Sequence, residues 1–80
     1  MADREENEKK FKNWIDRSDG TRMYWYEVKG RRGWFARYVK VVDKDEMTLS
    51  FRQEVFDEKS NLVEIHEKYP FDKGHRRLKE

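Results

Sequence analysis

The chain lacks cysteine and has few of the residues that interrupt regular structure. Its 80 residues include no cysteine, one proline and four glycines, and its longest uninterrupted apolar stretch is Met23–Tyr26. Without cysteine, neither a disulfide framework nor a thiolate metal site can form. The apolar stretch is far shorter than the ~18 residues of a membrane-spanning helix. The N-terminal segment also lacks the apolar core of a signal peptide. We therefore expect a cytoplasmic protein with no membrane partner.

Side-chain amides are also scarce, whereas charge is abundant. Charged residues make up 45% of the chain, yet the net charge is only +2. Such a composition is typical of heat-adapted proteins, and we expect a thermophilic source. Disordered chains are poor in aromatic residues, but this chain is 15% aromatic. We predict one folded domain over residues 1–80, with a small core because so short a chain buries little of its surface.

Residues 3–18 have the pattern of a helix. Asp3 can cap its first turn, and Phe11, Trp14 and Ile15 form a short apolar stripe at helical spacing. Gly20 follows and can adopt the left-handed conformation that commonly ends a helix. The spacing therefore predicts one N-terminal helix with a single apolar stripe.

Alternating apolar and polar residues predict four strands after the helix. The strands are expected over residues 22–28, 34–43, 47–56 and 62–69, separated by segments rich in glycine, aspartate, serine and asparagine. Asn61 is the residue expected to take a positive φ in the last turn. Pro70 cannot donate to a strand ladder and should end the last strand. Residues 70–80 are basic and are expected to be irregular. The predicted fold is α+β: one helix packed on a four-stranded antiparallel meander.

Two apolar faces are expected on this sheet, and one helix can cover only one of them. If Trp34 pairs with Lys29 and Met47 pairs with Val42, one face collects the core residues under the helix. An antiparallel sheet with one covered face would show polar residues on the other. Here the opposite face of the first hairpin is apolar and aromatic, with Arg37 beside it. The residues expected on this open face are Tyr24, Tyr26, Phe35, Arg37, Val39 and Val41.

An open apolar face of this kind indicates an interaction surface. The sequence therefore predicts a non-enzymatic interaction module whose partner is a second copy of the chain or another protein. A second interpretation is that the tail, with Phe71 and Leu78, folds over this face.

The alternative function is the binding of RNA or single-stranded nucleic acid by the first hairpin. Six bases and three acids fall within residues 19–43, and aromatic rings lie among them. Rings can stack on bases while cations hold phosphates. The residues expected to contact phosphate are Lys29, Arg31 and Arg32. Against this, a net charge of +2 is small for a nucleic-acid-binding protein.

Catalysis is not expected. Arg52, Glu54, Glu64 and His66 could lie in one row, but no serine, cysteine or threonine nucleophile accompanies them. Such a row is more typical of a cross-strand charge ladder on a solvated face. His66 and His75 do not have further ligands at metal spacing. We therefore predict no catalytic residue, no metal and no cofactor.

The segment Glu67–Arg76 runs Glu-Lys-Tyr-Pro-Phe-Asp-Lys-Gly-His-Arg. It resembles small uncharacterised prokaryotic domains whose last strand runs into a Tyr-x-x-Asp…Gly-His segment, some of them encoded in toxin–antitoxin loci. The proline and the spacing depart from that pattern. The resemblance implies a toxin-like ribonuclease in which Tyr69, His75 and Arg76 would be functional. The other interpretation of the segment is a basic, mobile chain end.

Overall fold

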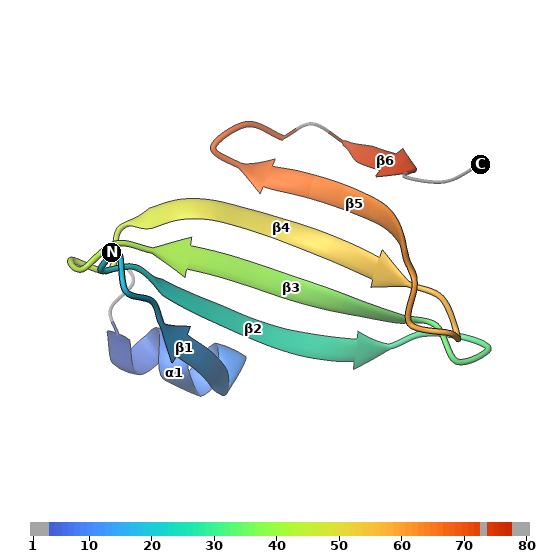
Figure 1. Cartoon of the computed structure of the whole chain (residues 1–80), viewed down its shortest axis with the longest axis horizontal. Coiled ribbons are helices and arrows are strands. Elements are labelled where there is room, and N and C mark those ends of the chain that lie inside the picture. The colour runs from blue at the N-terminus through green and yellow to red at the C-terminus, as the bar shows by residue number, and fades with distance from the viewer. Residues whose placement is uncertain (1–3, 73, 78–80) are drawn as a thin grey trace.

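The protein folds as one helix against an antiparallel sheet in which the strands follow chain order. The computed structural model describes residues 4–72, residue 74 and the backbone of residues 75–77. The elements in order are α1 (Arg4–Phe11), β1 (Asn13–Asp16), β2 (Arg22–Lys29), β3 (Phe35–Val42), β4 (Thr48–Phe56), β5 (Leu62–Tyr69) and β6 (His75–Arg77). The six strands form one meander, β1-β2-β3-β4-β5-β6 (Figure 1). The predicted α+β class is confirmed, but the described part of the chain adds a short strand at each edge of the four predicted ones.

The predicted helix over residues 3–18 is wrong in its second half. The helix ends at Phe11, because Lys12 takes a left-handed conformation with φ of 68°. The next four residues form β1, where Trp14 lies opposite Tyr24 and Ile15 opposite Met23. Aromatic and β-branched residues fit a pleated surface better than a helix. Gly20, with φ of 90°, therefore belongs to the β1–β2 turn rather than to a helix end.

The other strand predictions agree closely with the structure. The segments predicted as strands over residues 22–28, 34–43, 47–56 and 62–69 are β2 to β5, and no end differs by more than one residue. The tail prediction is partly wrong, since residues 75–77 form β6 and pair with β5. The positive φ of the β4–β5 turn falls on Ser60, at 65°, and not on Asn61. Leu78, predicted as a possible cover for the sheet, lies outside the described residues.

The predicted register between β2 and β3 is wrong by one residue. Lys29 lies opposite Phe35, not Trp34. The turn is closed by a hydrogen bond of 2.7 Å from the Gly30 amide to the Trp34 carbonyl, and this bond determines the pairing that follows. A shift of one residue moves each side chain of a strand to the other face. Tyr26 therefore lies opposite Tyr38, and Trp25 opposite Val39.

The helix packs on the face that carries the tyrosines, which we call the helix side. The Phe11 ring is 5.7 Å from the Tyr24 ring, 5.3 Å from the Tyr26 ring and 6.5 Å from the Phe51 ring, measured between centroids. Tyr24 is fully buried and Phe11 is 1% exposed. With Val42 they form the small core. The prediction that Tyr24 and Tyr26 stand on the open face is thus wrong.

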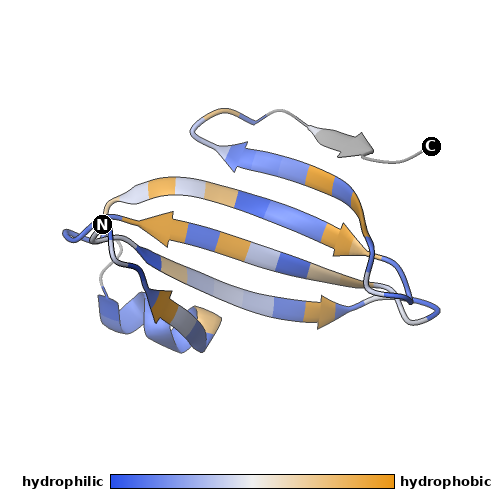
Figure 2. Cartoon of the chain, in the orientation of Figure 1, coloured by the Kyte–Doolittle hydropathy of each residue, from blue (hydrophilic) through white to orange (hydrophobic). Residues whose placement is uncertain are grey.

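The opposite face, here called the reverse face, is not covered by α1, because Phe11 of α1 packs against Tyr24 and Tyr26 on the helix side. Val39 and Val41 are nevertheless buried. Val39 lies between Trp25 and Arg52 on the neighbouring strands, so the long flanking side chains provide its cover. Figure 2 shows that hydrophobic and hydrophilic residues alternate along β3.

Candidate binding site

The helix covers only one end of the sheet, and the helix side is hollowed at the other end. This distal end carries the β2–β3 and β4–β5 turns, far from α1 in Figure 1. A groove of about 600 Å³ lies there, and we call it the distal groove. It is lined by Val28, Lys29, Gly30, Arg31, Arg32, Trp34, Phe35, Ala36, Tyr38, Gln53 and Val55. All three residues predicted to contact phosphate therefore lie at one apolar groove.

Within the described part of the chain, the cations of this groove form no salt bridge. Lys29, Arg31 and Arg32 are exposed residues at the β2–β3 turn. Five of the arginine side chains described by the structure hydrogen-bond another side chain: Arg4, Arg17, Arg22, Arg37 and Arg52. Among the described residues, neither Arg31 nor Arg32 has such a partner. Since guanidinium groups bind carboxylates and phosphates readily, this turn presents two arginines ready for an anionic group.

The turn that carries these cations is anchored to the neighbouring turn. The Trp34 indole Nε1 donates a hydrogen bond of 2.9 Å to a carboxylate oxygen of Glu58 in the β4–β5 turn. Gly33 has φ of 82°, and a Cβ built on it would lie 3.1 Å from the Cβ of Glu58. Glycine therefore allows the two turns to approach each other. The rim of the groove is consequently positioned by a tertiary contact as well as by its own strand ends.

Tyr38 is the aromatic residue that the groove and the core share. Its ring stacks on the Tyr26 ring at 5.0 Å and on the Phe51 ring at 6.3 Å between centroids. The Lys68 ammonium also lies 5.3 Å from its centroid. Because these neighbours surround the ring, its faces are not open to a stacked base. The Tyr38 side chain can instead offer its edge and hydroxyl to a ligand.

The six residues predicted to form one open face are divided between the two faces. Tyr24 and Tyr26 lie under the helix, whereas Phe35, Arg37, Val39 and Val41 lie on the reverse face. Phe35 stacks on Phe56 at 4.8 Å. Arg37 lies over the same Phe56 ring and also pairs with Glu27 at 2.8 Å. These residues therefore do not form a single interface. Val39 and Val41 are also buried, so they are not accessible to a partner.

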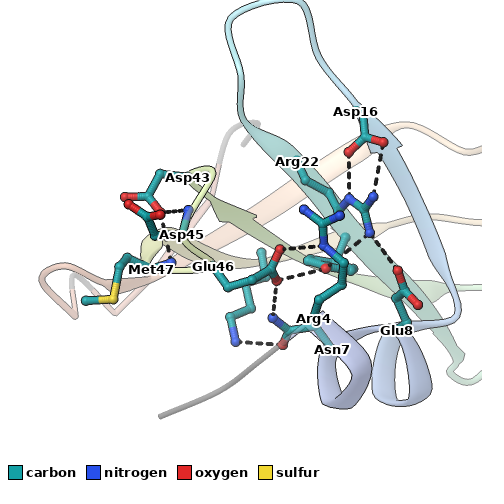
Figure 3. A network of polar contacts seen from close by, with 11 residues as sticks. Arg4, Asn7, Glu8, Asp16, Arg22, Asp43, Asp45, Glu46 and Met47 are labelled. Carbon is teal, nitrogen blue, oxygen red and sulfur yellow. Dashed lines mark hydrogen bonds and ion pairs between the residues drawn. The ribbon is translucent and has the colours of Figure 1, made fainter.

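A polar network that the sequence did not indicate lies at the helix end of the sheet (Figure 3). The Glu46 carboxylate accepts hydrogen bonds from the Tyr24 hydroxyl at 2.9 Å, Asn7 Nδ2 at 3.0 Å and Arg4 Nε at 3.2 Å. Burial together with the Glu46 carboxylate raises the pKa of Tyr24. Burial also lowers the pKa of Lys40, which donates to Asn7 Oδ1 at 3.0 Å.

The second centre of this network is Arg22, which is 8% exposed. Its guanidinium donates to both carboxylate oxygens of Asp16, at 2.6 and 3.1 Å, and to Glu8 at 2.8 Å. These bonds join α1, β1 and β2. The network thus holds the helix on the sheet. Because its charged groups pair with one another, we interpret it as structural and not as a ligand-binding site.

The predicted charged row on β4 and β5 is not formed. Arg52 lies opposite Glu67, and Gln53 opposite His66, so Arg52 and His66 point to different faces. His66 Nε2 instead lies 2.6 Å from an Asp72 carboxylate oxygen, a contact that lowers the pKa of Asp72. Of the residues singled out by the resemblance, Tyr69 is exposed at the end of β5. The backbones of His75 and Arg76 lie in β6, and their side chains are outside the described residues.

No group of three histidine, cysteine, aspartate or glutamate residues in the described part of the chain could hold a metal ion. The one described helix is neither long nor apolar enough to cross a membrane.

Comparison with known proteins yields no relative, since no family model, no curated protein and no solved structure matches the chain.

Proposed function

We propose that this protein is a small non-enzymatic interaction module, and that its distal groove binds a segment of a partner protein. The observation that carries the proposal is a pair of arginines, Arg31 and Arg32, at the rim of an apolar groove, with no counterion among the residues that the structure describes. Protein interfaces combine an apolar centre with a polar rim, and arginine is enriched in them. The groove has both parts, and the turn that carries its arginines is anchored to the neighbouring turn.

The chemistry of the groove defines the segment that would fit it. Val28 and Trp34 are 48% and 42% exposed, so they offer apolar contact area. Carboxylates placed beside the apolar side chains of a ligand would pair with the guanidinium groups, which favours acidic partners and speeds their association. The expected ligand is therefore a peptide segment with apolar residues next to aspartate or glutamate.

A random peptide library displayed on phage tests this proposal. We expect selection on the wild-type protein to enrich apolar sequences that contain aspartate or glutamate. Synthetic versions of these peptides should bind the Arg31→Gln/Arg32→Gln variant at least about tenfold more weakly, a loss of about 1.4 kcal/mol. The matched control is Lys9→Gln/Lys44→Gln, which removes two exposed charges of α1 and the β3–β4 turn and should bind as wild type.

Two outcomes would contradict the proposal. One is a selection that enriches no common sequence. The other is an equal loss of affinity in the two double variants, which would indicate attraction by net charge without a defined site. Val55→Glu, among the residues that line the groove, is a second test, because the added carboxylate should repel acidic peptides while both arginines stay in place.

Single-stranded nucleic acid is the second candidate ligand, and the grouping of Lys29, Arg31 and Arg32 favours it. Trp34 is the one ring of the groove with substantial exposure, whereas Tyr38 is surrounded by other side chains. The test is binding of an oligo-uridine and an oligo-thymidine over a series of salt concentrations. A nucleic-acid site predicts affinity that falls with salt, and a smaller salt dependence for Arg31→Gln/Arg32→Gln. Absence of binding would remove this candidate.

A further inference from the structure

The outer edge of β2 is paired over only half its length. β1 lies opposite Arg22–Trp25 and begins only at Asn13, directly after α1 and Lys12. The second half of β2, Tyr26–Lys29, therefore has no neighbour on that side in the part of the chain that the structure describes. Figure 1 shows β2 extending well beyond β1. Such an edge is a template for a further strand.

Two turns show which backbone groups point outward along this half-strand. The Gly30 amide bonds the Trp34 carbonyl in the β2–β3 turn, and the Arg17 amide bonds the Thr21 carbonyl in the β1–β2 turn. In an antiparallel ladder, hydrogen-bonded pairs alternate along a strand. Even-numbered residues of β2 therefore bond β3, and odd-numbered residues face outward. The amides and carbonyls of Glu27 and Lys29 are the outward groups beyond β1.

We propose that a second copy of this chain pairs with this edge, with a two-fold axis through Val28. Antiparallel pairing about that axis places Glu27 of each copy opposite Lys29 of the other. Both would be hydrogen-bonded pairs, giving four backbone hydrogen bonds between the copies. Val28 and Lys29 also line the distal groove, but the pairing uses neither Arg31 nor Arg32, so the test of self-association is distinct from the test of peptide binding.

Charge complementarity favours a second copy of the chain as the partner of this edge, and it favours the register with the axis at Val28. Side chains directly opposite in a pair lie on the same face, and unlike charges there stabilise the pairing. The axis at Val28 creates two glutamate–lysine pairs, whereas an axis at Glu27 would place two like carboxylates opposite each other. Arg37 already lies 2.8 Å from the Glu27 carboxylate, and a carboxylate has enough acceptor capacity for both cations.

Val28 supplies the apolar centre of the proposed contact. It is 48% exposed on the helix side. On the axis it would meet its own copy as a non-hydrogen-bonded pair, in which opposite side chains approach most closely. The pairing cannot extend past Tyr26, because Asn13 Nδ2 already donates to the Trp25 carbonyl at 3.2 Å. So short an interface should give a weak, concentration-dependent dimer.

Sedimentation equilibrium tests the proposal on the full chain at protein concentrations from about 10 µM to about 1 mM, the range of a weak complex. The mass of the wild-type protein should rise toward twice that of the monomer. Lys29→Glu places carboxylates opposite each other at both ends of the interface and should stay monomeric. Glu27→Lys should stay monomeric for the opposite reason. Lys44→Glu, in the β3–β4 turn, is the matched control and should behave as wild type.

Mixing the two monomeric variants gives the sharpest result. Glu27→Lys and Lys29→Glu together restore unlike charges at both pairs, so an equimolar mixture should form a mixed dimer. A wild-type protein that remains monomeric at the highest concentration would overturn the proposal. So would a Lys29→Glu variant that dimerises as well as wild type. Circular dichroism of each variant confirms that the fold is retained.

Discussion

The hydroxyl of Tyr24 donates a hydrogen bond of 2.9 Å to the carboxylate of Glu46. This contact joins β2 to the β3–β4 turn, and the same carboxylate accepts hydrogen bonds from Asn7 and Arg4 on the helix. Glu46 holds the left-handed position of its turn, with φ of 63°. The helix is thus held over Tyr24 by a residue that is remote from both in sequence.

Removing the hydroxyl of Tyr24 should lower the free energy of unfolding more than removing the hydroxyl of Tyr26. Hydrogen bonds to charged groups contribute about 1.5–3 kcal/mol, so we expect Tyr24→Phe to lower the free energy of unfolding by about that amount. Tyr26→Phe is the matched control, because the Tyr26 hydroxyl has no hydrogen-bond partner among the described residues. Urea denaturation followed by circular dichroism measures both. Equal losses would show that the Tyr24–Glu46 bond is not a specific support.

The stabilising contribution of the Glu46 carboxylate should be lost in acid. Burial would raise the pKa of its carboxyl, but hydrogen bonds from Asn7, Tyr24 and Arg4 outweigh burial and hold the pKa below its ordinary value of 4.5. A carboxyl with a lowered folded-state pKa stabilises the fold above the unfolded-state pKa. This contribution disappears as the pH falls from about 4.5 through the folded-state value.

The Glu46→Gln variant isolates this effect. Its free energy of unfolding should fall less steeply than that of the wild type between about pH 5 and pH 3, because one lowered carboxyl is missing. The acid loss should not vanish, since Asp16, Asp19, Asp57 and Asp72 also have lowered pKa values. Glu5→Gln, on the exposed side of α1, is the control. Identical pH profiles for Glu46→Gln and the wild type would contradict this prediction.

Phe11 should contribute far more stability than Trp14. Phe11 is 1% exposed at the centre of the core, whereas Trp14 is 39% exposed on β1. Truncating a buried phenylalanine typically costs about 3–5 kcal/mol, and Trp14→Ala should cost about 1 kcal/mol. Guanidinium denaturation followed by circular dichroism measures the difference. If Phe11→Ala does not fold, Phe11→Leu should still be less stable than Trp14→Ala. The reverse order would mean that β1, not α1, provides the main cover.

The β4–β5 turn offers a stabilising substitution. Ser60 is exposed and has φ of 65°, a conformation that disfavours residues with a Cβ. Ser60→Gly should therefore raise the free energy of unfolding by about 0.5–1 kcal/mol. Ser18→Gly, in the β1–β2 turn where the positive φ belongs to Gly20, should lower it by a similar amount. Thermal unfolding compares the two. A loss of stability in both would contradict the strain assigned to Ser60.

The strands were accessible to prediction because their signals are local. Alternation over eight or nine residues and the turn residues between them located β2 to β5 closely. The helix was harder, since Phe11, Trp14 and Ile15 match a helical stripe equally well. Only the pairing of Trp14 with Tyr24, a contact across a turn, makes that segment a strand. The sequence places Lys29, Arg31 and Arg32 at one turn, but it did not predict the groove that they line, because Trp34 and Glu58 lie on different hairpins.

The sequence by itself determined the class of the fold, the four long strands and the grouping of Lys29, Arg31 and Arg32 at one turn, because each depends on neighbouring residues. The tertiary structure decided which face the helix covers. That choice depends on one closing bond, Gly30 to Trp34, and on the capture of Tyr24 by Glu46 from a distant turn. A shift of one residue in a strand is nearly neutral for local preferences, yet it exchanges the two faces of the sheet. The closing bond of one turn and a contact distant in sequence therefore selected the register together, and with it the position of the distal groove.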